Sequence, residues 1–224
     1  EIQLRVYDDP VSGKESVLAK QTLEVDGSFE LKAIVKDKVQ YAILQVGQNC
    51  ADFYMERDKD LELSFVPPAK DPTKPEAFYE RHFFVPKVLG GRSEKLNEQI
   101  MAFNDSLDRF RESIYPMLVQ RKSPGLVAQK VDAFEERTTK HFSASEPFVR
   151  EHIKYSIASV EQTFFSFCDR MINKYMKGVQ PQFHNPAYVD FVLQYFQGVV
   201  QRMAIVTKHE ECKAVIQQRE AFAK

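Results

Sequence analysis

The sequence predicts an α+β protein in which a small antiparallel β-sandwich is followed by an all-helical, bundle-like domain. The first observation is a change of hydrophobic period, from every second residue up to residue 66 to every third or fourth residue after residue 93. These are the periods of a half-buried strand and of a helix with one buried face. The second observation is a Pro-rich stretch at the change of period. We therefore expect a sandwich domain at residues 1–66, a connector at residues 67–92 and a helical domain at residues 93–224.

Alternation of apolar and polar residues predicts the strands of the first domain. It is clearest at Ile2, Leu4 and Val6, and it returns at residues 17–25, 29–33, 39–46, 50–56 and 61–66. Asp26-Gly27 supplies the positive φ angles of a tight hairpin turn between the second and third of these runs. Several short strands with frequent turn signals are typical of an antiparallel sandwich.

The connector is predicted from its prolines, which exclude a helix or an interior strand. Its aromatic residues gather at Phe78, Tyr79, Phe83 and Phe84. Two interpretations of this aromatic group stay open. The group forms either an exposed binding strip or the apolar contacts that fix the connector to its neighbours.

The first two helices are predicted from a hydrophobic seam and from a start signal. The seam runs from Leu96 to Ile114 at spacings of three and four residues and ends near Tyr115-Pro116. Ser123-Pro124 then combines a cap residue with a proline at the first helical position, which predicts the start of a second helix.

Two more helices follow in the prediction. A capping-box pattern at residues 143–146 predicts the start of a third helix, whose apolar stripe continues to Tyr175 and makes it the longest element. Asn185-Pro186 predicts the start of a fourth helix, and residues 202–224 are expected to be further helix.

The composition excludes some classes of function. The 224 residues include 31 Lys and Arg against 32 Asp and Glu, a formal net charge of -1. Nucleic-acid binding needs a positive surplus to neutralise phosphates, so we expect no nucleic-acid partner. No apolar run approaches the ~20 residues of a membrane-spanning helix, so we expect no transmembrane segment. The chain begins without Met, and we expect a trimmed start, with any lipid anchor outside these residues.

The sequence contains none of the common catalytic motifs. The patterns H-E-x-x-H, G-x-S-x-G, G-x-x-x-x-G-K and G-x-G-x-x-G are all missing, as is C-x-x-C. His209 and Cys212 lie one helical turn apart, as two metal ligands would, but a metal site needs two more ligands and a solvated, charged helix face accounts for the same residues. Cys168 lies in an apolar stripe and is expected in the core, whereas Cys50 follows a turn and is expected to be exposed. We predict no metal, no cofactor and no active site in this chain.

Candidate binding residues were chosen from the connector and from helix ends, because such positions often line clefts. The candidates are Phe78, Tyr79, His82, Phe83, Tyr115, His184 and Tyr188. A structural interpretation competes for several of them, since His184 and Tyr188 flank a helix cap and Tyr115 ends a helix.

Short segments of the chain resemble a known family. They are VDGSFEL (residues 25–31), FYME (53–56) followed by LEL (61–63), and NPAYVDF (185–191) with YF (195–196). They resemble the N-terminal region of periplasmic, often lipid-anchored, thiol–disulfide oxidoreductase-like proteins of Gram-negative gut and environmental bacteria. The chain departs from the family at residues 57–59, where RDK stands in place of a Pro-Gly turn.

In that family a small β domain and a helical segment precede a thioredoxin-like module that carries the catalytic C-x-x-C. The resemblance implies a non-catalytic accessory or binding region, located in the periplasm or at the outer membrane, with the catalytic module downstream of residue 224. Its partner would be a protein or peptide, or that module. The alternative is a self-contained surface protein that binds a glycan or peptide through the sandwich or the connector.

Overall fold

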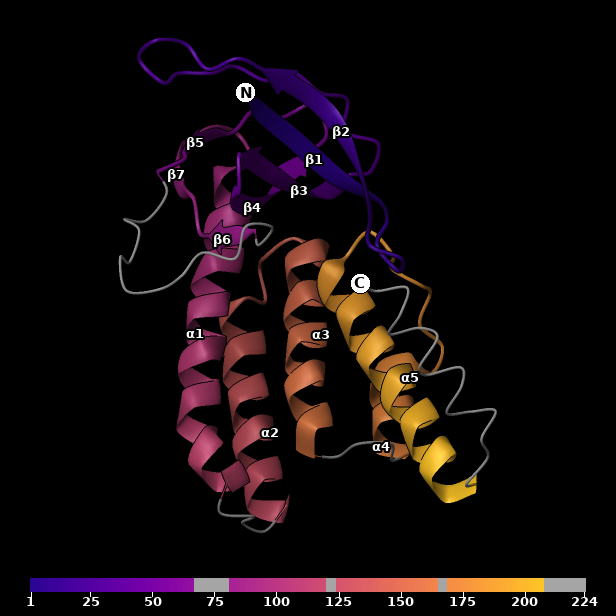
Figure 1. Cartoon of the computed structure of the whole chain (residues 1–224). Helices are drawn as coiled ribbons and strands as arrows, with labels where there is room; N and C mark the ends of the chain where they lie inside the picture. The colour runs from indigo at the N-terminus through magenta and orange to yellow at the C-terminus, as the bar shows by residue number, and fades with distance from the viewer. Residues whose placement is uncertain (67–80, 120–123, 165–168, 208–224) are drawn as a thin grey trace. The chain divides into compact units, whose positions relative to one another are not determined.

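A computed structural model describes residues 1–66, 81–119, 124–164 and 169–207 of the chain (Figure 1). Strands come first and helices follow, so the predicted α+β class is confirmed. The chain forms two compact units. The first consists of Glu1–Asn104 with Phe183–Pro186, and the second of Asp105–Gln182 with Ala187–Lys224.

The first unit contains a five-stranded sheet in the order β2-β1-β3-β4-β6. Its strands are β1 (Ile2–Asp9), β2 (Lys14–Gln21), β3 (Val39–Val46), β4 (Asn49–Glu56) and β6 (His82–Phe84). All neighbours are antiparallel except β4 and β6, which run parallel. A second, two-stranded sheet pairs β5 (Glu62–Ser64) with β7 (Lys87–Gly90).

One face of the five-stranded sheet forms the core of the first unit. Val6, Ala42 and Phe53 lie opposite one another on β1, β3 and β4, and all three are buried. Leu63 and Phe65, in and beside β5, pack against this core. The two sheets therefore enclose apolar side chains between them, as the predicted sandwich requires.

The predicted strand at residues 29–33 is wrong, although the turn before it forms. Gly27 has the predicted positive φ, at 83°, and its amide donates to the Glu24 carbonyl at 2.9 Å, but Asp26 does not have a positive φ, so the turn is not the predicted two-residue hairpin turn. Val25, expected to face inward, is fully exposed in this turn. Residues 29–33 belong to neither sheet, yet Phe29 and Leu31 still pack against the core. Within residues 29–33, alternation therefore predicted which side chains turn towards the core. A side chain can pack there without its backbone joining a hydrogen-bonded sheet.

Part of the predicted connector belongs to the sheets. Residues 82–84 form β6 and residues 87–90 form β7, and the ring of Phe84 contacts that of Phe65 at 4.9 Å. Pro86 lies between the two strands. Among the described residues β6 lies at the edge of its sheet, so this part of the connector forms no interior strand there, as its prolines predicted. Residues 67–80 lie outside the described part of the chain.

The start of the first helix, α1 (Glu94–Val119), is fixed by backbone contacts with Asp60 of the first unit. The Ser93 amide donates to the Asp60 carbonyl at 3.0 Å. Gly91 has a φ of +100°, and a Cβ there would lie 2.7 Å from the Asp60 carbonyl oxygen. Only glycine fits this approach, so the chain can turn from β7 into α1.

Asn97 on α1 completes the hydrogen bonding of β4. Its side-chain oxygen accepts from the Tyr54 amide, and its side-chain nitrogen donates to the Tyr54 carbonyl, both at 2.8 Å. Asn97 is 2% exposed. The amide side chain therefore takes the place of a neighbouring strand beyond the point where β6 ends, and it ties the first turn of α1 to the sheet.

Helix α1 does not end at Tyr115-Pro116, as predicted, but continues to Val119 with Pro116 inside it. Only three residues follow the proline, so its missing amide disturbs the last turn alone. The second helix, α2 (Pro124–His141), begins at the predicted proline, and α3 (Pro147–Phe164) begins just after the predicted capping box.

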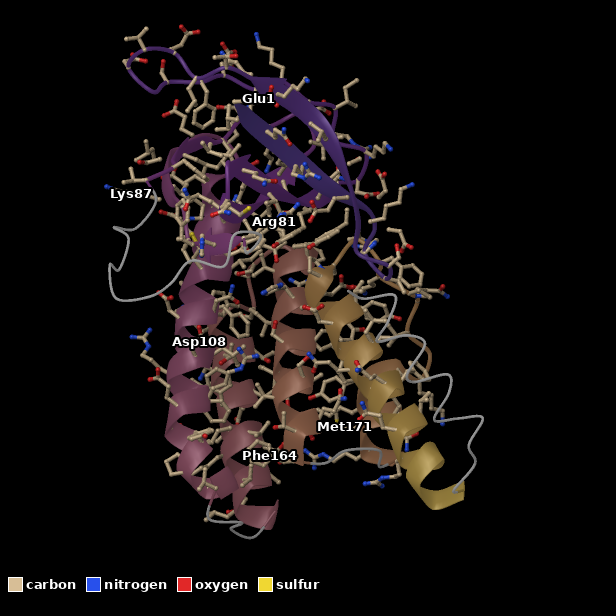
Figure 2. All side chains as sticks on the ribbon, viewed as in Figure 1. Glu1, Arg81, Lys87, Asp108, Phe164 and Met171 are labelled. Atoms are coloured by element: carbon tan, nitrogen blue, oxygen red, sulfur yellow. The ribbon has the colours of Figure 1, made fainter. Side chains whose placement is uncertain are left out.

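The prediction of one helix from residue 143 to Tyr175 is wrong. The helix α3 is followed by a short α4 (Asp169–Met171) and a π-helical turn, η1 (Ile172–Met176). The Tyr175 hydroxyl lies 2.6 Å from the Glu161 carboxylate. Fourteen residues of continuous helix would separate them by about 21 Å, so the chain folds back between α3 and η1. Phe164 and Met171, on either side of this break, both lie at the lower end of the unit in Figure 2.

The last described helix, α5 (Pro186–Thr207), starts at the predicted Asn185-Pro186. With α3, α4 and η1 it encloses a largely aromatic core, formed by Tyr155, Met171, Tyr175, Phe191 and Tyr195. The helix predicted at residues 208–224, and Cys168 and Cys212, lie outside the described residues. Across the described residues, every helix is too short or too polar to cross a membrane.

We expect Asn97→Leu to lower the free energy of unfolding by roughly 2–4 kcal/mol, because it leaves two buried backbone groups of Tyr54 unpaired. Urea denaturation followed by circular dichroism measures this loss. Glu98→Ala is the matched control, since Glu98 is exposed on the same helix and its removal should change stability by less than about 0.5 kcal/mol. Equal losses in the two variants would contradict the role of Asn97.

Candidate functional site

The structure distributes the predicted candidate residues over several elements. His82 and Phe83 are neighbours in β6, where Phe83 is 51% exposed and His82 is half-buried. His184 is exposed in the segment that belongs to the first unit. Phe78 and Tyr79 lie outside the described residues. His82 and Phe83 are adjacent in one strand, so their side chains point to opposite faces of the sheet and do not form a shared site.

The candidates of the second unit lie on different helices. Tyr115 is 63% exposed near the end of α1. Tyr188 is half-buried in the first turn of α5, and its ring contacts that of Tyr155 edge to face at 4.9 Å. Tyr188 therefore packs against the aromatic core of the second unit.

Cys50 was expected to be exposed, and this is wrong. It is fully buried in β4, and burial raises the pKa of its thiol. The strand β6 was not predicted, and its Phe83 lies opposite Cys50 in the parallel register, so both side chains project from the same face of the sheet. A buried thiol with a raised pKa is a poor nucleophile.

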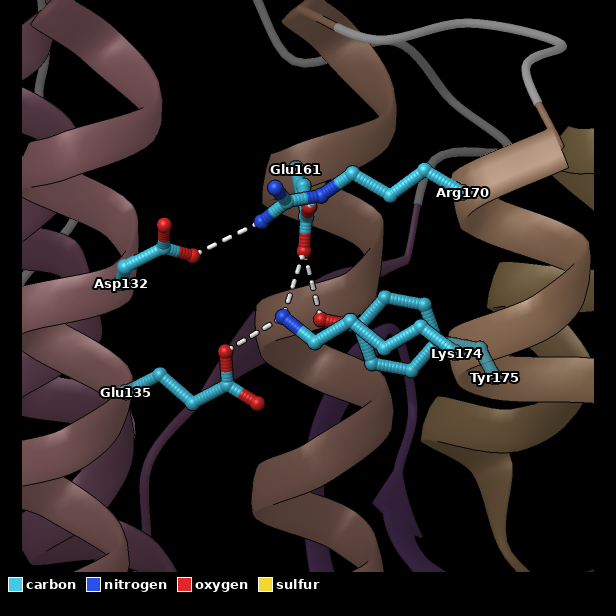
Figure 3. A network of polar contacts seen from close by, with 6 residues as sticks. All are labelled: Asp132, Glu135, Glu161, Arg170, Lys174 and Tyr175. Atoms are coloured by element: carbon cyan, nitrogen blue, oxygen red, sulfur yellow. Dashed lines mark hydrogen bonds and ion pairs between the residues drawn. The ribbon is translucent and has the colours of Figure 1, made fainter.

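The most developed polar site of the described residues was not predicted. It is centred on Glu161 of α3, whose side chain is 0% exposed (Figure 3). Its Oε1 accepts from Arg170 Nε at 2.5 Å, and its Oε2 accepts from Lys174 Nζ at 3.0 Å and from the Tyr175 hydroxyl at 2.6 Å. Three donors from α4 and η1 therefore converge on one buried carboxylate.

Two carboxylates of α2 complete this Glu161 network. Asp132 accepts from Arg170 at 2.8 Å, and Glu135 accepts from Lys174 at 2.5 Å (Figure 3). Asp132 and Glu135 are three residues apart and so lie on one face of α2. The network joins α2, α3, α4 and η1 through side chains alone.

The hydrogen bonds of the Glu161 network shift the pKa values of its members and so favour the protonation states that form these bonds. Burial opposes ionisation of Glu161, but the bonds from Tyr175, Lys174 and Arg170 outweigh it, so the pKa of this carboxyl lies below its usual value. Burial likewise disfavours the charged ammonium of Lys174, but the bonds to Glu135 and Glu161 raise its pKa overall. Burial and the bond to Glu161 raise the pKa of Tyr175.

These shifts determine what the site can do chemically. A general acid or base works best with a pKa near the working pH, and a nucleophilic lysine needs a lowered pKa. The pKa values of Glu161, Lys174 and Tyr175 are shifted away from those values, and three donors occupy most of the acceptor positions of the Glu161 carboxylate. The geometry suits a fixed structural lock between helices.

The sequence carried one signal for this site. Glu161 lies four residues after Ile157, on the apolar stripe of α3, where a charge must find partners inside the protein. Nothing in the sequence identified those partners, because Asp132 and Arg170 lie on other helices.

A smaller ion cluster stabilises the first unit. Glu15 of β2 accepts two hydrogen bonds from Arg81, at 2.6 and 2.9 Å, and one from Arg5 of β1 at 2.8 Å. The bonds from Arg81 and Arg5 lower the pKa of Glu15. Arg81, which Figure 2 labels, immediately precedes β6, so its ion pair with Glu15 fixes the start of that strand.

Nothing in the described ranges points to a metal centre, since no three His, Cys, Asp or Glu side chains lie close enough together to hold an ion. Comparison of the chain with protein-family models, curated proteins and solved structures found no match. The family resemblance described above therefore stays a prediction.

His152 is the buried titratable group of α3 outside the Glu161 network. Its side chain is 6% exposed, and burial lowers its pKa to about 4. The folded protein therefore holds His152 neutral at pH values where the unfolded chain would already bind a proton.

We expect Glu161→Gln to lower the free energy of unfolding by roughly 2–4 kcal/mol, because Arg170 and Lys174 lose the carboxylate that both contact. Urea denaturation at neutral pH measures the loss. The control is Asp132→Asn, which removes a single half-exposed ion pair and should cost less than about 1 kcal/mol. A smaller effect for Glu161→Gln than for the control would show that the network is not the lock.

Stability should fall as the pH drops from 6.5 towards 4, by roughly 3 kcal/mol from His152 alone. The sign follows because the unfolded state binds the proton in this window and the folded state does not. Above pH 6.5 both states hold the neutral imidazole and the effect vanishes. Urea denaturation across this range should show a weaker pH dependence for His152→Gln. His141→Gln, at an exposed position, should keep the full dependence.

Proposed function

We propose that this chain is a non-catalytic accessory or binding region of a cell-envelope protein, with a thioredoxin-like module downstream of residue 224. The family resemblance suggests this placement, in the periplasm or at the outer membrane. The partner is a protein or peptide, or the downstream module itself.

The observation that carries the non-catalytic part of this proposal is the Glu161 network. Its carboxylate, ammonium and phenol have pKa values shifted away from those that acid–base or nucleophilic catalysis needs. Cys50, the thiol of the described β unit, is buried with a raised pKa. These groups support a rigid scaffold better than a reaction centre.

A second candidate is a self-contained surface protein that binds a peptide or glycan. The exposed side chains of Phe83 and Val85, at 51% and 68%, favour it, because large apolar groups on a strand edge offer a contact surface. A downstream C-x-x-C within a βαβ pattern in the reading frame would favour the accessory role. A stop codon directly after residue 224 would favour the surface protein.

The purified chain should give no reduction of insulin above the rate of dithiothreitol alone, because the sequence has no C-x-x-C pair and Cys50, the cysteine among the described residues, is buried with a raised pKa. Turbidity at neutral pH follows the reaction, and thioredoxin serves as the positive control. The decisive comparison is with Cys50→Ser. Turnover by the unmodified chain that disappears in this variant would contradict the non-catalytic role.

A further inference from the structure

The two edges of the five-stranded sheet differ in how open they are to another strand. The edge strand β2 carries the exposed charges of Lys14 and Lys20, and its register with β1 shifts at Leu18. Charges and bulges on an edge strand oppose the addition of a further strand. The opposite edge strand, β6, is short, but its sequence His-Phe-Phe, followed by Val85, contains no Lys, Arg, Asp or Glu, and it pairs with β4 without a register shift.

The backbone of β6 pairs with β4 on one side, and on its other side no described strand pairs with it. The His82 amide donates to the Gln48 carbonyl at 2.9 Å, and Phe83 lies opposite Cys50 in the parallel register. Backbone groups of successive strand residues point to opposite sides, so the amide and carbonyl of Phe83 point away from β4. Among the described residues, β6 has β4 as its single neighbour in the sheet.

The side chains in and beside β6 also fall into two groups, one packed against the protein and one exposed. Phe84 is half-buried against Phe65, and the Glu15–Arg81 ion pair holds the residue before β6. Phe83 is 51% exposed and Val85 is 68% exposed. The strand is therefore fixed on its inner side while it presents apolar side chains beside an open backbone edge.

We propose that the outer edge of β6 binds an extended peptide segment by strand addition, with apolar side chains at alternate positions of the peptide. This inference rests on the proposed binding role and names the chemistry of the partner. The Phe83 amide donates to a peptide carbonyl, and the Phe83 carbonyl accepts from a peptide amide. Main-chain bonds supply the affinity, and contacts with Phe83 and Val85 select apolar residues.

The open backbone is what favours a peptide over a glycan or a lipid surface. A glycan or a lipid would contact the Phe83 and Val85 side chains, but it would have no need of the Phe83 amide. Substitutions at Phe83 that remove the ring with or without the backbone N–H therefore distinguish a peptide from a glycan or a lipid surface. Phe83→Ala removes the ring and keeps the N–H, whereas Phe83→Pro removes both. His82 and Phe84 make the bonds to β4, so a proline at position 83 leaves that ladder intact.

The probe is a fluorescein-labelled peptide of alternating Thr and Val, with seven residues and blocked ends, titrated with the full chain and followed by fluorescence anisotropy. We expect saturable binding, a moderate weakening in Phe83→Ala, and a further loss of about tenfold in Phe83→Pro, the effect of one main-chain hydrogen bond. Val17→Ala, at an exposed apolar position on the opposite edge strand, should bind as the unmodified chain does.

Hydrogen exchange gives a second readout that needs no substitution. Saturating peptide should slow exchange of the Phe83 amide. Strand addition is overturned by lack of saturable binding up to about 1 mM peptide, by equal losses in Phe83→Ala and Phe83→Pro, or by unchanged exchange at Phe83. Each of these results leaves the non-catalytic role untouched, since that role fails only if the chain reduces insulin.

Discussion

The buried carboxylate of Glu161 is the interaction on which the helical unit depends. Moving a charge out of water costs several kcal/mol unless donors compensate for it, and the Glu161 side chain is 0% exposed. Compensation is complete only when α4 and η1 bring Arg170, Lys174 and Tyr175 to α3 together. Apolar contacts between helices tolerate small shifts, whereas three hydrogen bonds to one carboxylate do not. The network therefore selects one arrangement of these elements from the several that aromatic packing alone would allow.

The first unit follows the same logic with other polar groups. Asn97 binds the backbone of Tyr54, which lies 43 residues earlier, and Glu15 binds Arg81, which lies 66 residues later. Each contact fixes the start of an element, α1 in one case and β6 in the other. In both units, apolar side chains supply the bulk of the burial, and a few buried polar side chains determine where each element begins.

The success of sequence-based prediction depended on whether a signal was local. The starts of α2 and α5 were predicted because a proline at the first helical position acts within its own turn. The break after Phe164 was not predicted, because Met171 and Tyr175 keep helical spacing with α3 whether or not the chain folds back. The strand β6 was missed because three residues become a strand only beside β4. The Glu161 network was missed for the same reason, since its members come from four separate elements.

The use of charge inside the molecule also limits how it can recognise a partner. Glu15, Arg81, Glu161 and Lys174 are all committed to internal ion pairs, so displacing them would cost the fold the contacts that position its elements. The groups best placed to contact a partner are then those that make no structural contact inside the fold. On the first unit, the exposed ring of Phe83 and its backbone edge, which has no strand partner among the described residues, are such groups, whereas the buried thiol of Cys50 is not. Phe83 lies opposite Cys50 in the parallel register, so a surface suited to an extended chain and a shielded thiol stand side by side on the same pair of strands.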